Sequence, residues 1–486
     1  MTNTNSYVIG VDHVRFHVDN ALQTAAYYIS NLGFVPMAYE GLETGNKDFC
    51  THVIRQNDIV LAFTSPLHKA PCVLQTNVQL HPYLFTTLKH FEQTKTIEYK
   101  DEDPIRKFYK SLEAHGSNHA HDMALLVSDV EKAYEQACKH PKTKALTPPT
   151  RLYLDEDKSR FIEFACIATQ FGEDAWIHTL INRDHQGSDI GQVFLPGFRQ
   201  RKLNPDQEVP PQHLEYVDHF AIAIHKGTLI EGIQWYSEAL GFERFYNNDD
   251  EEDQKGIQIE SSEKDLGGLT TMVVAPSLIS SLNRHIELHE LNKQSTKEMN
   301  ESEIHHRREL IASKVMKKMI KFVLIEPVNT KQSKSQIQEF LDYNDGPGIA
   351  HLAVHTEDII NAVSKSRKAG VDYITVPPTY YTNWREKKEL YDMVNEDWTL
   401  LEKNAILVDG VVFSKEDDES LQENHGFRYL LQTFTKPIED RPTFYFEIIS
   451  RRGNSGFGKG NIKALFDAIE RLQIERGNLF IEEDKQ

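Results

Sequence analysis

The 486-residue chain is poor in cysteine: it has four, and none of them forms a CxxC pair. This scarcity argues against a disulfide framework and against a structural zinc site built on cysteine pairs. We expect all four to be reduced thiols; they are Cys50, Cys72, Cys138 and Cys166.

Long apolar runs and an excess of positive charge are also missing. No run approaches the roughly 20 apolar residues that a membrane-spanning helix needs, and the first residues, MTNTNSYVIGVDH, resemble neither a secretory nor a transit signal. The formal net charge is −19, which repels nucleic acid and anionic membranes. We therefore expect a soluble, cytoplasmic protein that binds neither nucleic acid nor membrane.

The chain is long enough for two domains, since a domain commonly takes roughly 100–200 residues. An internal repeat supports this division. The segment VDHVRFHVDNALQTAAYYISNLGF at 11–34 is similar to VDHFAIAIHKGTLIEGIQWYSEALGF at 217–242. Each begins with the alternation of a half-buried strand and continues as a helix that ends at Leu-Gly-Phe, where glycine is a common C-terminal cap.

A second pair of segments extends the repeat. DMALLVSDVEKAYEQACKH, from residue 122, and HLAVHTEDIINAVSKSRKAG, from residue 351, both predict a strand followed by an amphipathic helix. Each half then ends in a strand-rich stretch, which we match as RFIEFACI at 160–167 and TFYFEIISR at 443–451. We therefore interpret the two halves as the product of a duplication of one domain.

The boundary between the halves is expected in the polar, proline-rich stretch at 195–216. We place the N-terminal domain at 1–204 and the C-terminal domain at 205–486. A charged segment at 277–320 separates two predicted strands, GLTTMVVA and KFVLIEP. It is interpreted as an insertion in the C-terminal domain with a solvated surface role.

Three polar residues of the C-terminal half lie inside apolar strand patterns: His219, His351 and Glu447. Singly, each is explained at least as well by a hydrogen-bonded core residue. Together, two imidazoles and one carboxylate form the ligand set typical of non-haem Fe(II) oxygenases, because three protein ligands leave coordination positions open. They are our candidate metal ligands for one Fe(II) per chain.

Several motifs, in order along the chain, resemble those of the 4-hydroxyphenylpyruvate dioxygenase family within the vicinal oxygen chelate superfamily. They are YVDHFAIAI, SKSQIQEFLDYNDGPGIAHLAVHTEDI, VPPTYYTNW, LLQTFTKPIEDRPTFYFEIISRRG and GFGKGNIKALFDAIE, together with HTLINRDHQGSDIGQVFLPGF in the first half. The resemblance covers almost the whole chain apart from 277–320.

This resemblance implies an α+β fold of two tandem domains, each made of paired βαβββ units that form a curved, half-open barrel. His219, His351 and Glu447 match the family's iron ligands. The family oxidises 4-hydroxyphenylpyruvate with dioxygen to homogentisate and carbon dioxide, a step of tyrosine catabolism. The N-terminal domain is structural in the family, so we expect no metal at the matching positions, which we take to be His13, Asp122 and Glu163.

The resemblance also implies further site residues. Gln336, Gln432 and Asn461 match catalytic positions, and Phe434, Phe457 and Leu465 match the substrate pocket. Five other pocket positions depart from the family pattern. This chain has Thr271 where the family has serine, Ile325 in place of asparagine and Ala350 in place of glutamine. Tyr445 and Ile462 each replace a phenylalanine.

These departures leave the substrate open. The partners implied are a small 2-oxo acid and O2, with 4-hydroxyphenylpyruvate as the leading acid. A different 2-oxo acid, and benzylic hydroxylation of the kind that hydroxymandelate synthase performs, are enzymatic alternatives. A non-catalytic binding protein on the same scaffold is an alternative of another class. The sequence leaves a homodimer and a homotetramer open as assemblies.

Overall fold

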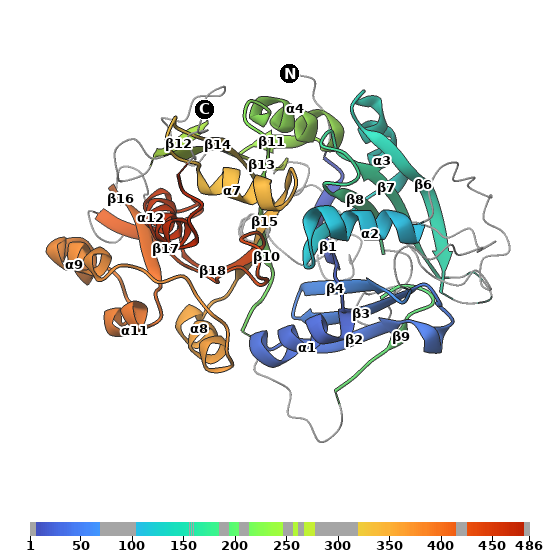
Figure 1. The fold of residues 1–486 in the computed structure, drawn as a ribbon, viewed down its shortest axis with the longest axis horizontal. Coiled ribbons are helices and arrows are strands. Elements are labelled where there is room, and N and C mark those ends of the chain that lie inside the picture. Colours follow the sequence, from blue (N-terminus) through green and yellow to red (C-terminus); the bar gives the residue numbers. More distant parts are fainter. Residues whose placement is uncertain are drawn as a thin grey trace, which may run out of the picture. The chain divides into compact units, whose positions relative to one another are not determined.

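A computed structural model of the protein describes residues 6–68, 104–183 except 155, 157 and 159, 194–203, 213–245, 256–260, 267–277, 319–414 and 425–480 (Figure 1). The cysteines in this part, Cys50, Cys138 and Cys166, are free thiols, as expected. No helix in these ranges is both long and apolar enough to span a bilayer. Most of the predicted insertion, 278–318, lies outside the described residues.

The first half forms one open mixed sheet of nine strands in the order β6-β7-β8-β5-β1-β4-β3-β2-β9. The parallel pairs are β1 with β4 and β5 with β8, and β1 lies antiparallel to β5 at the centre. The strands are β1 (Val8–His17), β2 (Val35–Glu40), β3 (Phe49–Gln56), β4 (Ile59–Pro66), β5 (His119–Val127), β6 (Lys144–Tyr153), β7 (Phe161–Ala168), β8 (Ile177–Asn182) and β9 (Arg199–Gln200).

The second half forms a second open sheet in the order β11-β13-β14-β10-β15-β18-β17-β16, with β12 paired to β13. β10 lies antiparallel to β15, and β15 lies parallel to β18. The strands are β10 (Val217–Ala223), β11 (Phe242–Arg244), β12 (Ile257–Glu260), β13 (Gly268–Pro276), β14 (Lys321–Val328), β15 (Gly348–His355), β16 (Leu407–Ser414), β17 (His425–Phe434) and β18 (Tyr445–Arg452).

Helix α1 begins and ends where local chemistry predicts. Asn20 caps α1 by accepting from the Gln23 amide at 3.0 Å, and Gly33 ends it in the left-handed region at φ 81°. The helices are α1 (Ala21–Leu32), the 3-10 turn η1 (Leu42–Thr44), α2 (Pro104–His115), α3 (Val130–Lys139), α4 (Leu229–Leu240), α7 (Gln336–Tyr343), α8 (Ile359–Lys368), α9 (Pro378–Glu386), α10 (Lys388–Asp392), α11 (Trp398–Lys403) and α12 (Lys459–Arg476).

The predicted duplication is confirmed by the register of the central strands. His13 pairs with Ala124 across β1 and β5, as His219 pairs with Ala353 across β10 and β15. Each pairing also shifts register two residues further along the first strand, after Arg15 in one sheet and after Ala221 in the other. The two sheets therefore have the same central strand pairing, including the position of this β-bulge.

The match that we predicted for the last strands is wrong. RFIEFACI is β7, which lies antiparallel to β8, whereas TFYFEIISR contains β18, which lies parallel to β15. The strand that lies parallel to β5 is β8, so β8 is the counterpart of β18. The error arose because both stretches are apolar strands, and only long-range pairing distinguishes them.

The chain divides into two compact units. The first holds residues 1–211, 231–244 and 274–321, and the second holds 212–230, 245–273 and 322–486. Helix α4 thus follows β10 in sequence but groups mainly with the first unit. The predicted boundary near residue 205 falls in 204–212, outside the described residues, and remains a prediction.

Candidate metal centre

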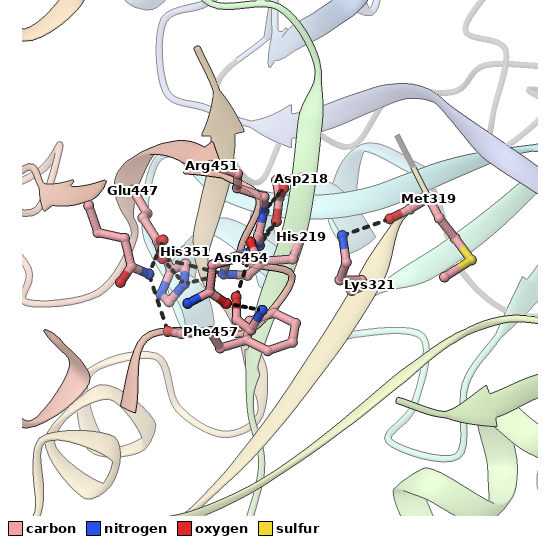
Figure 2. A network of polar contacts seen from close by, with 11 residues as sticks. Asp218, His219, Met319, Lys321, His351, Glu447, Arg451, Asn454 and Phe457 are labelled. Carbon is pink, nitrogen blue, oxygen red and sulfur yellow. Dashed lines mark hydrogen bonds and ion pairs between the residues drawn. The ribbon is translucent and has the colours of Figure 1, made fainter. Parts of the chain in front are cut away.

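The three predicted ligands converge in the second unit. Nε2 of His219 and Nε2 of His351 are 3.4 Å apart, and each lies 3.3 Å from the same Oε2 of Glu447. Figure 2 shows the three side chains pointing toward one another. All three are buried. Bonds of about 2.1 Å to one shared ion produce donor separations of this size, so the set fits a single metal ion.

Strand geometry explains the convergence. His219 lies on β10, His351 on the neighbouring β15 and Glu447 on β18 beyond it. Glu447 is in register with Ala353, and so is His219. The β-bulge at Ala350, immediately before His351, changes which way the following side chains point, as bulges beside active sites commonly do.

A buried ion pair supports His219 from behind (Figure 2). Asp218 accepts from Nδ1 of His219 at 2.9 Å, and its two oxygens also accept from Arg451 at 2.8 and 2.7 Å. A proton held on Nδ1 leaves Nε2 as the lone-pair nitrogen that a metal needs. Arg451 also donates to the carbonyl oxygens of Asn454 and Gly456, which fixes the loop after β18.

The second histidine has a different partner. Nδ1 of His351 lies 2.9 Å from the hydroxyl of Tyr445, and the two rings are 4.9 Å apart between centroids. Burial, reinforced by the charge of Glu447, raises the pKa of Tyr445, so its hydroxyl stays neutral. The two imidazoles are therefore oriented by unlike groups, one by a carboxylate and the other by a phenol.

Glu447 is held by a chain of amides. Gln432 donates to Oε1 of Glu447 at 2.7 Å and accepts from the Asn461 amide at 2.8 Å. Asn461 in turn accepts from the Tyr380 hydroxyl at 3.1 Å. Because Gln432 occupies Oε1, the carboxylate presents Oε2 to the two histidines.

Electrostatics favour an ionised carboxylate at this centre. Burial alone would raise the pKa of Glu447, but His219 and His351 hold it well below its usual range. Burial lowers the pKa of His351 against the attraction of Glu447. Burial acts in the same direction on His219, yet Glu447 and Asp218 raise its pKa. An ionised carboxylate beside two imidazoles is the protonation state that a cation requires.

The three ligands line a cavity of about 1040 Å³, measured to its open mouth. Exposed Val411 and Lys459 lie at that mouth. A cavity beside a buried ligand set is the usual form of a small-molecule site. The centre can therefore hold a metal ion and a small organic molecule together.

Comparisons with known proteins agree with this geometry. Residues 217–392 match the model of the Glyoxalase/Bleomycin resistance protein/Dioxygenase superfamily. The chain is 35% identical to 4-hydroxyphenylpyruvate dioxygenase of Dictyostelium discoideum over 97% of its own length and 100% of the relative's. It is 32% identical to the Tetrahymena thermophila enzyme of that name, over 98% and 93% of the two chains.

The chain belongs to the 4-hydroxyphenylpyruvate dioxygenase family. It is therefore an enzyme of the dioxygenase class, as the sequence motifs predicted. A solved structure of a 4-hydroxymandelate synthase triple mutant from Streptomyces coelicolor shares the fold, with a TM-score of 0.63 and 21% identity over 96% of this chain and 99% of that one. The predicted α+β fold of tandem vicinal-oxygen-chelate domains is confirmed.

Most residues predicted from the family resemblance line the cavity. Besides the three ligands they are Thr271, Ile325, Gln336, Ala350, Phe434, Tyr445, Phe457, Ile462 and Leu465. Gln432 and Asn461 are not among the lining residues, and they reach the site through Glu447. Their catalytic role stays a prediction.

Sequence reasoning missed several residues that support the centre. Asp218 and Arg451 form the buried pair behind His219, and Tyr380 ends the amide chain. One signal was available, because the motif VDH occurs at 11–13 and again at 217–219, and its aspartate is as regular as its histidine. Arg451 had no such signal, since its partner is 233 residues away.

The first half does not assemble the group that we matched to the ligands. Asp122 is in register with Ile177, and His351 is in register with Tyr445 two residues before Glu447. Thr179, not Glu163, is therefore the counterpart of Glu447. Glu163 lies on β7 and pairs instead with Arg151 at 3.0 Å.

Among the described residues, two groups of side chains have potential ligand atoms close together. One is the buried triad, and the other is Glu215, His355 and Glu357. In the second group Glu357 is exposed and Glu215 is partly so. His13 and Asp122 belong to neither group.

Proposed function

We propose that this protein is a 2-oxo acid dioxygenase that uses one Fe(II) held by His219, His351 and Glu447. The observation that carries the proposal is the set of three buried donor atoms, 3.3–3.4 Å apart, in the wall of a cavity. Two imidazoles and one carboxylate with open positions favour non-haem iron over metals that prefer closed tetrahedral sites. The family relationship supports the same chemistry.

When bound, Fe(II) would supply positions for the carboxylate and keto oxygens of the acid and for dioxygen, and the reducing power to activate the latter. The chain's own residues prepare that centre. Asp218 keeps the proton of His219 on Nδ1, and Gln432 turns Oε2 of Glu447 toward the histidines. Phe434 and Phe457 line the cavity and exclude water from the reacting atoms.

The reference reaction for this proposal is the one that the family resemblance implies, in which 4-hydroxyphenylpyruvate and O2 give homogentisate and CO2. Both atoms of dioxygen enter the organic product, one in its new carboxylate and one in its new hydroxyl group, and the CO2 comes from the carboxylate of the acid, so no second organic substrate is required. The protein's task is to hold the acid so that its side chain, after decarboxylation, lies next to the oxidant.

Anaerobic loading with Fe(II) followed by addition of 2-oxo acids tests the proposal. We expect one equivalent of iron, and oxygen uptake matched one to one by CO2 release. Chromatography of the product from 4-hydroxyphenylpyruvate separates ring hydroxylation from benzylic hydroxylation. If the protein binds one equivalent of iron but consumes no oxygen with any aromatic or aliphatic 2-oxo acid, the proposal is wrong. The alternative of a non-catalytic binding protein on this scaffold would then remain.

A further inference from the structure

A second cavity lies beside the one that holds the triad, between α7, α12 and the loop that joins β17 to β18. Its volume is about 500 Å³, measured to its open mouth, against about 1040 Å³ for the first. All of its lining residues belong to the second unit and to the described part of the chain. Much of the lining is apolar, with Phe340, Ile374, Pro442, Ile469 and Leu472 among its members.

The two cavities share one wall. Four side chains line both of them, namely Gln336, Ile337, Ala350 and Tyr445. Ala350 is the smallest of the four, at a position where the family resemblance implies glutamine. The Tyr445 hydroxyl is bonded to Nδ1 of the ligand His351. The second cavity therefore approaches the metal centre from the side of His351.

The two cavities open at opposite ends of α12. Lys459, the first residue of the helix, is exposed at the mouth of the first cavity, and Arg476, the last residue, is exposed and lines the second. A helix of 18 residues rises about 1.5 Å per residue, so its ends lie roughly 25 Å apart. A 2-oxo acid that fills the first cavity and its mouth therefore leaves the second opening clear.

The second cavity offers little that binds water or an anion. Arg476 is paired with Glu339 at 2.6 Å, and the Thr443 hydroxyl donates to Glu439 at 2.7 Å. Of the lining residues, which are all described, only Gln336 has a buried side-chain polar atom, Oε1, without a hydrogen bond. A buried water normally has about three partners, so this single acceptor holds one weakly. A small apolar molecule gains from the same space.

We infer that the second cavity is a site for dioxygen, from which O2 reaches the metal centre while the 2-oxo acid occupies the first cavity. The inference rests on the proposed function, for which it supplies the path of the second substrate. Dioxygen is small and apolar, as this lining requires. The carboxylate of a 2-oxo acid suits it poorly, because Arg476 already has an anionic partner.

Xenon tests the cavity without iron and without turnover, because this apolar atom occupies apolar cavities in proteins. In crystals of the metal-free full chain under xenon pressure, we expect xenon between α7 and α12. Leu472→Trp should exclude it, since the larger ring fills the space. Ile474→Trp is the matched control on the same helix, at a position that is 51% exposed and outside the lining, and it should keep the xenon. A wild-type cavity without xenon overturns the inference.

Oxygen kinetics test the route itself. With the Fe(II)-loaded full chain and saturating 4-hydroxyphenylpyruvate, Leu472→Trp should lower kcat/KM for O2 roughly tenfold, because it slows the encounter of O2 with the centre. The loss should appear in KM for O2 and not in kcat. Leu472→Phe should give a smaller loss, in line with its smaller ring, and Ile474→Trp should match the wild type.

The outcomes separate this inference from the proposed function. An equal loss in Leu472→Trp and Ile474→Trp overturns the inference and leaves the dioxygenase assignment intact. So does a normal kcat/KM for O2 in a Leu472→Trp protein that no longer binds xenon. If iron binds and no 2-oxo acid supports oxygen uptake, the proposed function itself fails, and the inference fails with it even where xenon binds.

Discussion

The two units carry the same kind of buried ion pair, yet among the residues that the structure describes a ligand triad forms in the second unit and not in the first. In the first unit, Asp12 accepts from His13 at 2.7 Å and from Arg183 at 3.0 Å, as Asp218 does from His219 and Arg451 in the second. Arg183 also donates to the carbonyl oxygen of Phe194, whose ring contacts His13 at 4.9 Å between centroids. The pair behind the histidine is thus part of the duplicated fold and does not by itself make a metal site.

The difference lies at the other two ligand positions. Where the second unit has His351 and Glu447, the first has Asp122 and Thr179. Thr179 donates to both oxygens of Asp122, through its backbone amide at 3.0 Å and its hydroxyl at 2.7 Å. Asp122 is therefore held by the neighbouring strand, and burial raises its pKa. These positions offer one imidazole and one carboxylate, and both oxygens of that carboxylate already accept from Thr179.

The space beside the ligands differs as well. By strand register Ala221, Ala223 and Ala350 of the second unit correspond to Arg15, His17 and His121 of the first. In the first unit the rings of His17 and His121 stack at 4.1 Å between centroids. Ala350 lines the cavity of the second unit, whereas at its matching position in the first unit His121 stacks on His17. A metal centre on this fold needs both the ligands and the room.

The largest expected effect is the loss of a metal ligand in the second unit, compared with the loss of the buried histidine of the first unit, His13. His351→Ala should abolish stoichiometric metal binding and lower oxygen uptake by at least about 1,000-fold, because the centre loses one of three ligands. His13→Ala should retain one metal per chain and near-normal kcat. Metal analysis after desalting, with oxygen-electrode rates, measures both. Equal metal loss in the two variants would place a second ion in the first unit.

The second largest effect is expected from neutralising Asp218, the carboxylate that accepts from Nδ1 of His219. Asp218→Asn should weaken metal binding by roughly 10- to 100-fold, because the carboxylate that orients His219 becomes neutral. Asp12→Asn should leave metal affinity unchanged. Both should lower the free energy of unfolding, by up to about 3–5 kcal/mol, because each leaves a buried arginine without its ion pair. Competition with a chromophoric chelator and denaturant titration separate the two quantities.

A smaller effect is expected at Tyr445, whose counterpart in the first unit is Ile177. Tyr445→Phe removes the hydrogen bond to Nδ1 of His351, and it should weaken metal binding by about tenfold. Tyr373→Phe is the matched control, since it also removes a buried hydroxyl bonded at 2.7 Å, to Ser366, away from the centre. A similar loss of affinity in both variants would show a general effect of lost hydrogen bonds.

The smallest effect concerns pH and the histidines of the first unit. Burial, together with the neighbouring His115 and His121, lowers the pKa of His119 well below 6.5, so the folded state keeps this ring neutral. The unfolded state takes up a proton as pH falls below 6.5, and stability should decrease. His119 accounts for roughly 0.8 kcal/mol of loss between pH 7.5 and 6.

His119→Phe keeps an aromatic ring in the stack with His115 and should flatten this dependence. Unfolding free energies at the two pH values, measured for both proteins, check the prediction. An unchanged slope in the variant would mean that other groups carry the pH dependence.

Local sequence patterns were enough to identify the duplication, the strands of each half and the three residues of the triad. Alternation marks buried strands, the VDH repeat aligns β1 with β10, and a histidine or glutamate inside an apolar strand is rare enough to stand out. These signals are local. They required no knowledge of which strands pair.

Features that depend on pairing between distant strands became visible in the folded chain alone. It made Thr179 the counterpart of Glu447, because β5 pairs with β8 and not with β7. It also brought Arg451 to Asp218 across 233 residues. Finally, the fold showed that the Thr271 hydroxyl donates to the carbonyl oxygen of Leu324. Strand order and side-chain bonding of this kind arise from packing, which no local pattern encodes.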